Sequence, residues 1–309
     1  MKKILALLAV IFASSLFAAT TYINIGTGGT AGTYYPLGGA FAEIWNNKLK
    51  DVNATAESTG ASVASVNMMQ KGDIDVAIIQ NDVASYAENG IELFKEKVPT
   101  IKGMACLYSE PIQCITTNPN IKTIADLKGK NVAIGAIGSG TYCNAVQILT
   151  AAGITDKDYK AQYLSFAESA TGLRDGQVDA AFIVAGAPTS AVVDLATQKN
   201  VRVVEVTGDL AKALKTKYSY YTDYTIKGGT YSTQKEDAHT LTVKSMLIVS
   251  SKMSEDMVYN MLKTMYESTD RIKAAHSVGA FITADTALQG MSIELHPGAK
   301  KYFDEKGIK

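Results

Sequence analysis

Residues 24–36 read Asn24-Ile25-Gly26-Thr27-Gly28-Gly29-Thr30-Ala31-Gly32-Thr33-Tyr34-Tyr35-Pro36, a run rich in glycine and hydroxyl side chains. The apolar residues before it predict a short strand, and Pro36 followed by apolar residues at helical spacing predicts a helix. The glycines allow backbone N–H groups to point into one concavity, and the helix start adds positive partial charge there. We therefore expect this loop to hold a small anion.

Two other interpretations of the loop are open at this point. Its first six residues after Ile25 match the dinucleotide pattern G-x-G-x-x-G/A, with Glu57 roughly where an acidic ribose partner is sought. A plain glycine turn without any ligand is the other interpretation. The rest of the chain must decide between them.

The N-terminus predicts a secretory signal peptide over residues 1–19. Met1-Lys2-Lys3 is a basic start, and residues 4–17 form an apolar run that is shorter than the roughly 20 residues needed to span a bilayer. No later segment of the sequence is long and apolar enough to span a membrane. We expect an exported, periplasmic protein.

Charge and metal-ligand spacing exclude several classes of partner. Removing Lys2 and Lys3 leaves 28 basic side chains against 30 acidic ones, which argues against a nucleic-acid or anionic-membrane surface. The histidines are widely separated, and the cysteines show no metal spacing, so we expect neither a metal nor a cofactor. Cys106 and Cys114 could pair in an oxidising compartment, or all three cysteines, Cys143 included, are buried thiols.

An internal repeat indicates two lobes with one plan. Gly32-Thr33-Tyr34-Tyr35 recurs as Gly140-Thr141-Tyr142-Cys143, and residues 72–79 resemble residues 176–183. Strands that alternate with helices predict an α/β fold in which each lobe is a mainly parallel sheet flanked by helices. Ligands of such sheets bind beyond the carboxyl ends of the strands, so two facing lobes make a cleft.

The lobes are expected to divide the chain into three parts. Residues 20–108 form the first part of lobe I, residues 109–220 form lobe II, and residues 221–309 form the return connection and the second part of lobe I. Hinges are expected near residues 108–112 and after Val206. Residues 106–108 and 112–115 read as two β segments separated by Ser109-Glu110-Pro111. The tyrosines of residues 218–231 either cover a ligand at the cleft edge or pack against the hinge.

Several motifs together resemble the TAXI family of TRAP-transporter solute receptors. They are the loop at residues 25–38, the Gly72 and Asp75 turn, and the stretches Asp126-Leu127-Lys128-Gly129-Lys130 and His296-Pro297-Gly298-Ala299. The resemblance covers nearly the whole chain after the signal peptide. It implies a two-lobe, type II-like periplasmic binding protein that delivers a small carboxylate, such as glutamate or 2-oxoglutarate, to a TRAP membrane permease.

The predicted site combines both glycine loops with residues at the strand ends. Backbone N–H groups and hydroxyls of the loops would hold the anion, tyrosines would flank it, and Gln80 and Asn81 would read an amino, keto or amide group. No arginine lies in a predicted strand-end loop, so a bidentate arginine is not expected. The candidate ligand-binding residues are Thr27, Gly28, Gly29, Thr30, Gly32, Tyr34, Tyr35, Ser62, Gln80, Asn81, Ser139, Gly140, Thr141, Tyr142, Gly186 and Pro188.

Two other functional classes are weighed against this one. A receptor of the same two-lobe class could serve an ABC importer or a sensor kinase, with a ligand such as a thiamine precursor or a sulfonate. An exported enzyme has less support, because Ala136-Ile137-Gly138-Ser139-Gly140 lacks the first glycine of G-x-S-x-G. We therefore expect no catalytic residues, and we expect a monomer whose partners are its small ligand and a membrane permease.

Overall fold

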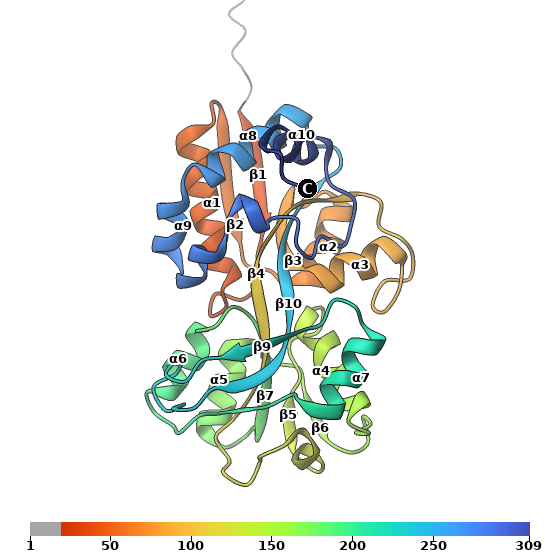
Figure 1. The fold of residues 1–309 in the computed structure, drawn as a ribbon, viewed down its shortest axis with the longest axis vertical. Coiled ribbons are helices and arrows are strands. Elements are labelled where there is room, and N and C mark those ends of the chain that lie inside the picture. Colours follow the sequence, from red (N-terminus) through yellow and green to blue (C-terminus); the bar gives the residue numbers. More distant parts are fainter. Residues whose placement is uncertain (1–19) are drawn as a thin grey trace, which may run out of the picture.

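The computed structural model describes residues 20–309, so the predicted signal peptide lies outside the described residues. The chain forms two lobes, one above the other in Figure 1, joined by two long strands. Ten strands make one continuous set of pairings in the order β2-β1-β3-β10-β4-β7-β5-β6, with β8 on β4 and β9 on β10. Helices flank the sheet in both lobes (Figure 1), which confirms the predicted fold class.

Lobe I is built from both ends of the described chain. Its first part contains β1 (Thr21–Gly26), α1 (Tyr34–Lys48), β2 (Val52–Glu57), α2 (Ser62–Lys71), β3 (Val76–Gln80) and α3 (Asn81–Asn89). Its second part contains α8 (Glu255–Tyr266), α9 (Thr269–Ala275), two 3₁₀ turns (Ser277–Phe281 and Ala284–Thr286) and α10 (Pro297–Lys306). The apolar faces of α1, α8 and α10 close over the sheet and bury Trp45, Phe41, Met261 and Phe303.

Lobe II repeats the strand–helix plan. It contains a 3₁₀ turn (Ile124–Leu127), β5 (Asn131–Ala133), α4 (Gly140–Ala151), β6 (Lys160–Gln162), α5 (Phe166–Asp175), β7 (Ala180–Val184), α6 (Ser190–Ala196), β8 (Arg202–Val204), α7 (Gly208–Lys217) and β9 (Thr222–Ile226). Separate apolar clusters lie around Ile148 and around Leu195. Each lobe therefore has a core of its own.

The internal repeat is present in the strand order and in matching side-chain roles. β1 pairs in parallel with β2 and β3, and β5 pairs in parallel with β6 and β7. The Asp75 carboxylate accepts a hydrogen bond of 2.9 Å from the backbone N–H of Asn24, and the Asp179 carboxylate accepts one of 2.8 Å from that of Asn131. Each aspartate thus ties the turn before one strand to the neighbouring parallel strand.

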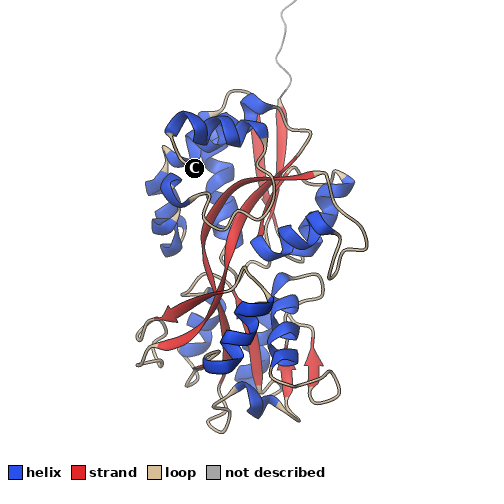
Figure 2. Cartoon of the chain, turned by 45° about the vertical axis from the view of Figure 1, so that its right-hand side comes forward, coloured by secondary structure: helices blue, strands red, loops and turns tan. Residues whose placement is uncertain are grey.

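Two antiparallel strands connect the lobes. β4 (Ile101–Thr116) and β10 (Ala238–Ser250) run from one lobe into the other, as Figure 2 shows. The prediction of two β segments around residues 109–111 is wrong, because β4 continues through them. Pro111 is tolerated there because β4 changes its partner at this point, from β10 to β7, and proline is accepted where a ladder hydrogen bond is not required.

The position of the second crossing differs from the expected one after Val206. It lies in β10, whose residues 238–242 pair with β9 and whose residues 245–249 pair with β3. The limits 20–108, 109–220 and 221–309 remain predictions about how the chain divides. All three cysteines are free thiols and buried, as one of the two alternatives expected.

Candidate functional site

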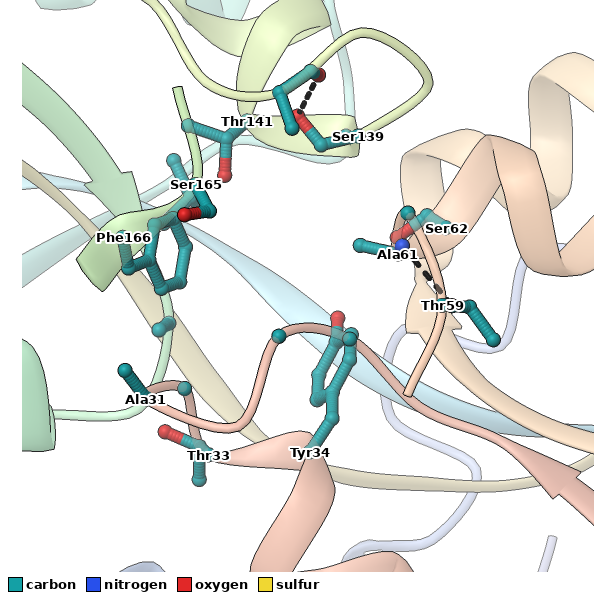
Figure 3. A pocket seen from close by; sticks show the side chains of 18 of the residues that line it. Ala31, Thr33, Tyr34, Thr59, Ala61, Ser62, Ser139, Thr141, Ser165 and Phe166 are labelled. Atoms are coloured by element: carbon teal, nitrogen blue, oxygen red, sulfur yellow. Dashed lines mark hydrogen bonds between the residues drawn. The ribbon is translucent and has the colours of Figure 1, made fainter. Parts of the chain in front are cut away.

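A cavity of about 260 Å³ lies between the lobes, at the carboxyl ends of the parallel strands (Figure 3). Both lobes contribute to it. The residues that line it are Gly28, Gly29, Thr30, Ala31, Gly32, Thr33, Tyr34, Ser58, Thr59, Gly60, Ala61, Ser62, Gln80, Glu110, Ala136, Ser139, Gly140, Thr141, Leu164, Ser165, Phe166, Ala167, Val184 and Ala185.

The starts of five helices converge on this cavity. The residue that immediately precedes α1, α2, α3, α4 and α5 lines it in each case: Thr33, Ala61, Gln80, Ser139 and Ser165. This follows from the fold, because each of these helices comes directly after a parallel strand whose carboxyl end faces the other lobe. No lysine or arginine is among the lining residues. Positive potential in the cavity therefore comes from helix ends, whose first N–H groups lack partners within the helix.

Ten of the predicted site residues line this cavity. They are Gly28, Gly29, Thr30, Gly32, Tyr34, Ser62, Gln80, Ser139, Gly140 and Thr141. The two glycine loops therefore face each other across one space, as the repeat predicted. Whether these residues bind a ligand stays a prediction.

The other six predicted residues, Thr27, Tyr35, Asn81, Tyr142, Gly186 and Pro188, are not among those that line the cavity. The Thr27 hydroxyl donates a hydrogen bond of 2.6 Å to the carbonyl of Glu57 and so ties β1 to β2. The Asn81 amide donates to the carbonyl of Gly290 and accepts from the N–H of Lys244, which fixes it against the second part of lobe I.

The side-chain hydroxyls around the cavity differ in their availability. Ser139 donates to the carbonyl of Ala136 over 2.7 Å and accepts from the N–H of Tyr142 over 3.1 Å, so its hydroxyl caps α4. Ser62 accepts from the N–H of Gln80 over 3.1 Å. The Thr141 hydroxyl points toward the middle of the cavity in Figure 3. Thr141 is thus better placed than Ser139 to bond a ligand.

A buried carboxyl group, Glu110, also lines the cavity. It comes from β4 between the lobes and is fully buried. The Tyr34 hydroxyl donates a hydrogen bond of 2.7 Å to Glu110 Oε2, whereas Glu110 Oε1 has no partner among the described residues. Burial raises the pKa of Glu110 to about 8, although the neighbouring hydroxyls of Tyr34 and Tyr108 lower it in part. Burial and the nearby Glu110 carboxyl hold the pKa of Tyr34 well above its ordinary value.

Sequence reasoning missed Glu110 and the start of α5. Phe166 of lobe II packs against the glycine loop of lobe I, where a Cβ added to Gly32 would lie 3.4 Å from its ring. A usable signal existed for α5, because Ser165 and Glu168 form a capping box, which marks a helix start. No comparable signal exists for Glu110, which lies inside a strand.

The backbones of the two lobes are hydrogen-bonded beside the cavity. The N–H groups of Val63 and Ala64, at the start of α2, donate to the carbonyl of Gly138 in lobe II over 3.0 and 3.1 Å. On the other side, the Thr33 hydroxyl donates to the carbonyl of Gly186 over 3.3 Å. The lobes are therefore in contact around the cavity.

Next to the cavity, α3 of lobe I meets α4 of lobe II through a buried carboxylate. Asn144 of α4 donates to Asp82 Oδ2 over 2.7 Å and to the Tyr221 hydroxyl over 2.9 Å. Burial raises the pKa of Asp82 to about 6, although the bonds from Asn144 and from the N–H of Val83 lower it in part. Asp82 is thus a buried acid at the contact between the lobes.

Tyrosines extend this contact. The Gln147 amide of α4 donates to the Tyr86 hydroxyl of α3 over 2.8 Å, and its oxygen accepts from the Tyr221 hydroxyl over 2.6 Å. Tyr86 also bonds Tyr220 through their hydroxyls. Neither Tyr220 nor Tyr221 is among the residues that line the cavity. Tyr220 and Tyr221 therefore pack at the contact between α3 and α4, whereas the second expectation placed this tyrosine-rich segment against the hinge.

Two features are absent from residues 20–309. No group of three or more histidine, cysteine, aspartate or glutamate side chains is arranged to hold a metal ion. No helix in this range combines the length and the apolar character that crossing a membrane requires.

Comparisons with known proteins identify a family. The model of the NMT1-like family matches residues 25–307. A putative aliphatic sulfonates-binding protein of Escherichia coli (strain K12) is 30% identical over 119 residues, which is 38% of this chain and 33% of that protein. The aligned part is therefore about a third of that relative.

Solved structures are similar in fold. The periplasmic aliphatic sulphonate binding protein from Escherichia coli has a TM-score of 0.50 and 16% identity, covering 92% of this chain and 82% of that one. A putative L-cystine ABC transporter from Listeria monocytogenes has a TM-score of 0.51 and 15% identity, covering 85% and 98%.

These findings correct one expectation and place the chain in a family. The matching family is the NMT1-like family, and the relatives above carry the names of sulfonate-binding and ABC-transport proteins. The expected assignment to the TAXI family was therefore wrong, and so were the TRAP permease and the glutamate or other carboxylate ligand that it implied. The chain belongs to the NMT1-like family and has the α/β fold of the periplasmic solute-binding proteins.

Proposed function

We propose that this protein is an extracytoplasmic solute receptor that binds a small organic sulfonate between its lobes and delivers it to an ABC-type importer. One observation carries the proposal: five helix starts converge on a cavity that no lysine or arginine lines. The names of the relatives suggest the sulfonate class and the importer class. We assign no catalytic step to the site, and we expect the receptor to act as a monomer in the periplasm.

Helix starts suit an anion that keeps its charge at every pH. Each contributes up to about half a positive charge near its first N–H groups, and such N–H groups bind tetrahedral oxyanions. A sulfonate has three oxygens that point in different directions. Donors from α4 in lobe II and from the glycine loop of lobe I surround the cavity from opposite sides, so they suit a head group of this shape.

The cavity also offers an apolar surface for an aliphatic tail. Leu164, Phe166 and Val184 line it together with several alanines. Burying each methylene of a tail contributes about 0.8 kcal/mol. A ligand that contacts both lobes stabilises the closed arrangement in proportion to its extra affinity for that arrangement. The permease can then distinguish a loaded receptor from an unloaded one.

A ligand panel of one chain length tests the proposal. We expect butanesulfonate to raise the melting temperature, while butanoate raises it less and butylammonium has no effect. A ligand at 100 times its dissociation constant stabilises the folded state by about 2.7 kcal/mol. A higher affinity for butylammonium or for butanoate than for butanesulfonate would contradict the proposal.

Substitution of two threonines on helix α4 tests whether the ligand binds in this cavity. Thr141→Val removes a hydroxyl that lines the cavity, so it should weaken butanesulfonate binding measured by calorimetry. Thr150→Val changes an exposed residue of the same helix α4 and should leave the affinity unchanged. Equal affinities of both variants and the unmodified protein would remove this cavity from the binding site.

A further inference from the structure

Glu110 brings a carboxyl group, which is negatively charged when ionised, to a cavity that is proposed to bind an anion. Glu110 lines the cavity and is fully buried, and its Oε1 has no hydrogen-bond partner among the described residues. No ion pair involves it among residues 20–309. An ionised carboxylate in this position would repel a bound anion, and a buried unpaired charge is costly. The protonation state of Glu110 therefore decides which ligands the cavity accepts.

The number of protons on the Tyr34–Glu110 pair determines whether the pair can donate a hydrogen bond to a ligand. The bond from the Tyr34 hydroxyl to Glu110 Oε2 uses the single proton of the phenol. With Glu110 ionised, this pair presents only lone pairs to a ligand. With Glu110 neutral, the pair has one further proton, on the carboxyl oxygen that lacks a partner. Only the neutral form can donate a hydrogen bond to an anion.

We propose that Glu110 recognises the ligand as a neutral carboxylic acid, whose O–H donates a hydrogen bond to the bound anion, so that anion binding is coupled to protonation of Glu110. This inference rests on the proposed function, because it assumes an anion in the same cavity. It narrows the ligand class to anions without an ammonium group. An ammonium would instead require the ionised carboxylate.

The groups around Glu110 are consistent with this state. The titratable side chains that act on it are Tyr34 from α1, Tyr108 from its own strand β4 and Asp82 from α3. Both phenols have raised pKa values and stay neutral, and Asp82 has a pKa of about 6. Above neutral pH, therefore, Glu110, with its pKa of about 8, is the member of this group that titrates.

The test measures the affinity for butanesulfonate by calorimetry at two pH values. Because sulfonates remain ionised throughout, a change in affinity reports on the protein. If the protein binds the anion only while Glu110 is neutral, raising the pH from about 7 to about 9.5 should lower the affinity for butanesulfonate roughly 30-fold. Near pH 9, the binding enthalpies in buffers of different ionisation enthalpy should reveal uptake of about one proton per ligand.

Two variants test whether the proton that is taken up on binding is carried by Glu110. Glu110→Gln keeps a neutral donor and should make the affinity independent of pH in this range, with no proton uptake. Glu96→Gln changes an exposed glutamate outside the cavity and should keep the full pH dependence. If Glu110→Gln does not fold, proton uptake by the unmodified protein still tests the proposal.

The outcomes separate this inference from the function on which it rests. Butanesulfonate binding that is independent of pH, or that tightens as the pH rises, would overturn the role of Glu110 and leave the anion receptor standing. A pH dependence that persists in Glu110→Gln would also overturn it. If neither the unmodified protein nor Glu110→Gln binds any sulfonate at either pH, the proposed function fails, and this inference fails with it.

Discussion

Replacing Asp82 by asparagine should change how folding stability depends on pH. Asp82 is fully buried where α3 meets α4, and burial raises its pKa from 3.8 to about 6. An acid with a raised folded-state pKa keeps its proton when the unfolded chain has already released it. Raising the pH from 3.8 to 6 therefore destabilises the folded state, and the effect is constant above that window.

The shift gives the size of the effect. About two pKa units correspond to about 3 kcal/mol, at 1.36 kcal/mol per unit. Relative to the Asp82→Asn variant, the unmodified protein should lose this amount of unfolding free energy between about pH 3.5 and pH 7. The variant itself loses one hydrogen bond, because both carboxylate oxygens of Asp82 accept one, from Asn144 and from the N–H of Val83. That loss shifts the variant's curve of unfolding free energy against pH by a constant amount. The difference in slope between the curves of the two proteins is unaffected.

Urea unfolding at a series of pH values measures this difference. Chemical denaturation without ligand, monitored by circular dichroism, gives the unfolding free energy of each protein at each pH. Asp304→Asn serves as a matched control, because Asp304 is exposed on α10. Parallel curves for the unmodified protein and Asp82→Asn would refute the reasoning, since they would mean that Asp82 has the same pKa in both states.

Three further substitutions test the site and the contact between the lobes. Gly140→Ala places a Cβ on the buried Gln80 side chain of the other lobe, so it should cost about 1–3 kcal/mol of closure and weaken butanesulfonate binding roughly 10- to 100-fold; unchanged affinity would show that the lobes need not approach this closely. Tyr221→Phe removes bonds to Gln147 and Asn144 and should lower the unfolding free energy by about 1–3 kcal/mol in urea, whereas Tyr163→Phe, at an exposed position, should have no effect. Phe166→Ala enlarges the cavity, so calorimetry should show hexanesulfonate gaining affinity relative to ethanesulfonate; an unchanged ratio would place the tail elsewhere.

Much of the fold follows from local patterns in the sequence. The glycine loops, the apolar strands and the G-x-[IV]-D turns repeat, and each element depends mainly on its own residues and near neighbours. Asp75 and Asp179 hold corresponding strands through corresponding bonds, so a repeated motif has a repeated structural role. Eight of the ten predicted site residues that line the cavity do so for the same reason, because they are carried on the two glycine loops that the repeat identifies.

The parts that sequence reasoning missed depend on contacts between distant segments. Ser109-Glu110-Pro111 resembles a break between strands, yet β10 pairs with these three residues and β7 pairs with the residues that follow, which keeps the strand continuous. Glu110 is a site residue only because this strand passes between the lobes. Similarly, Gln147, which accepts a hydrogen bond from Tyr221, bonds Tyr86 across the two lobes, and no spacing along the chain indicates that contact.

The positive potential of the cavity comes from the backbone, which affects how this protein tolerates changes in its side chains. Peptide groups at five helix starts supply it, and every residue except proline carries the same N–H group. Mutation of one side chain or chemical modification of lysines therefore leaves these N–H groups in place. Side chains elsewhere around the cavity can then change without loss of the N–H groups at the helix starts.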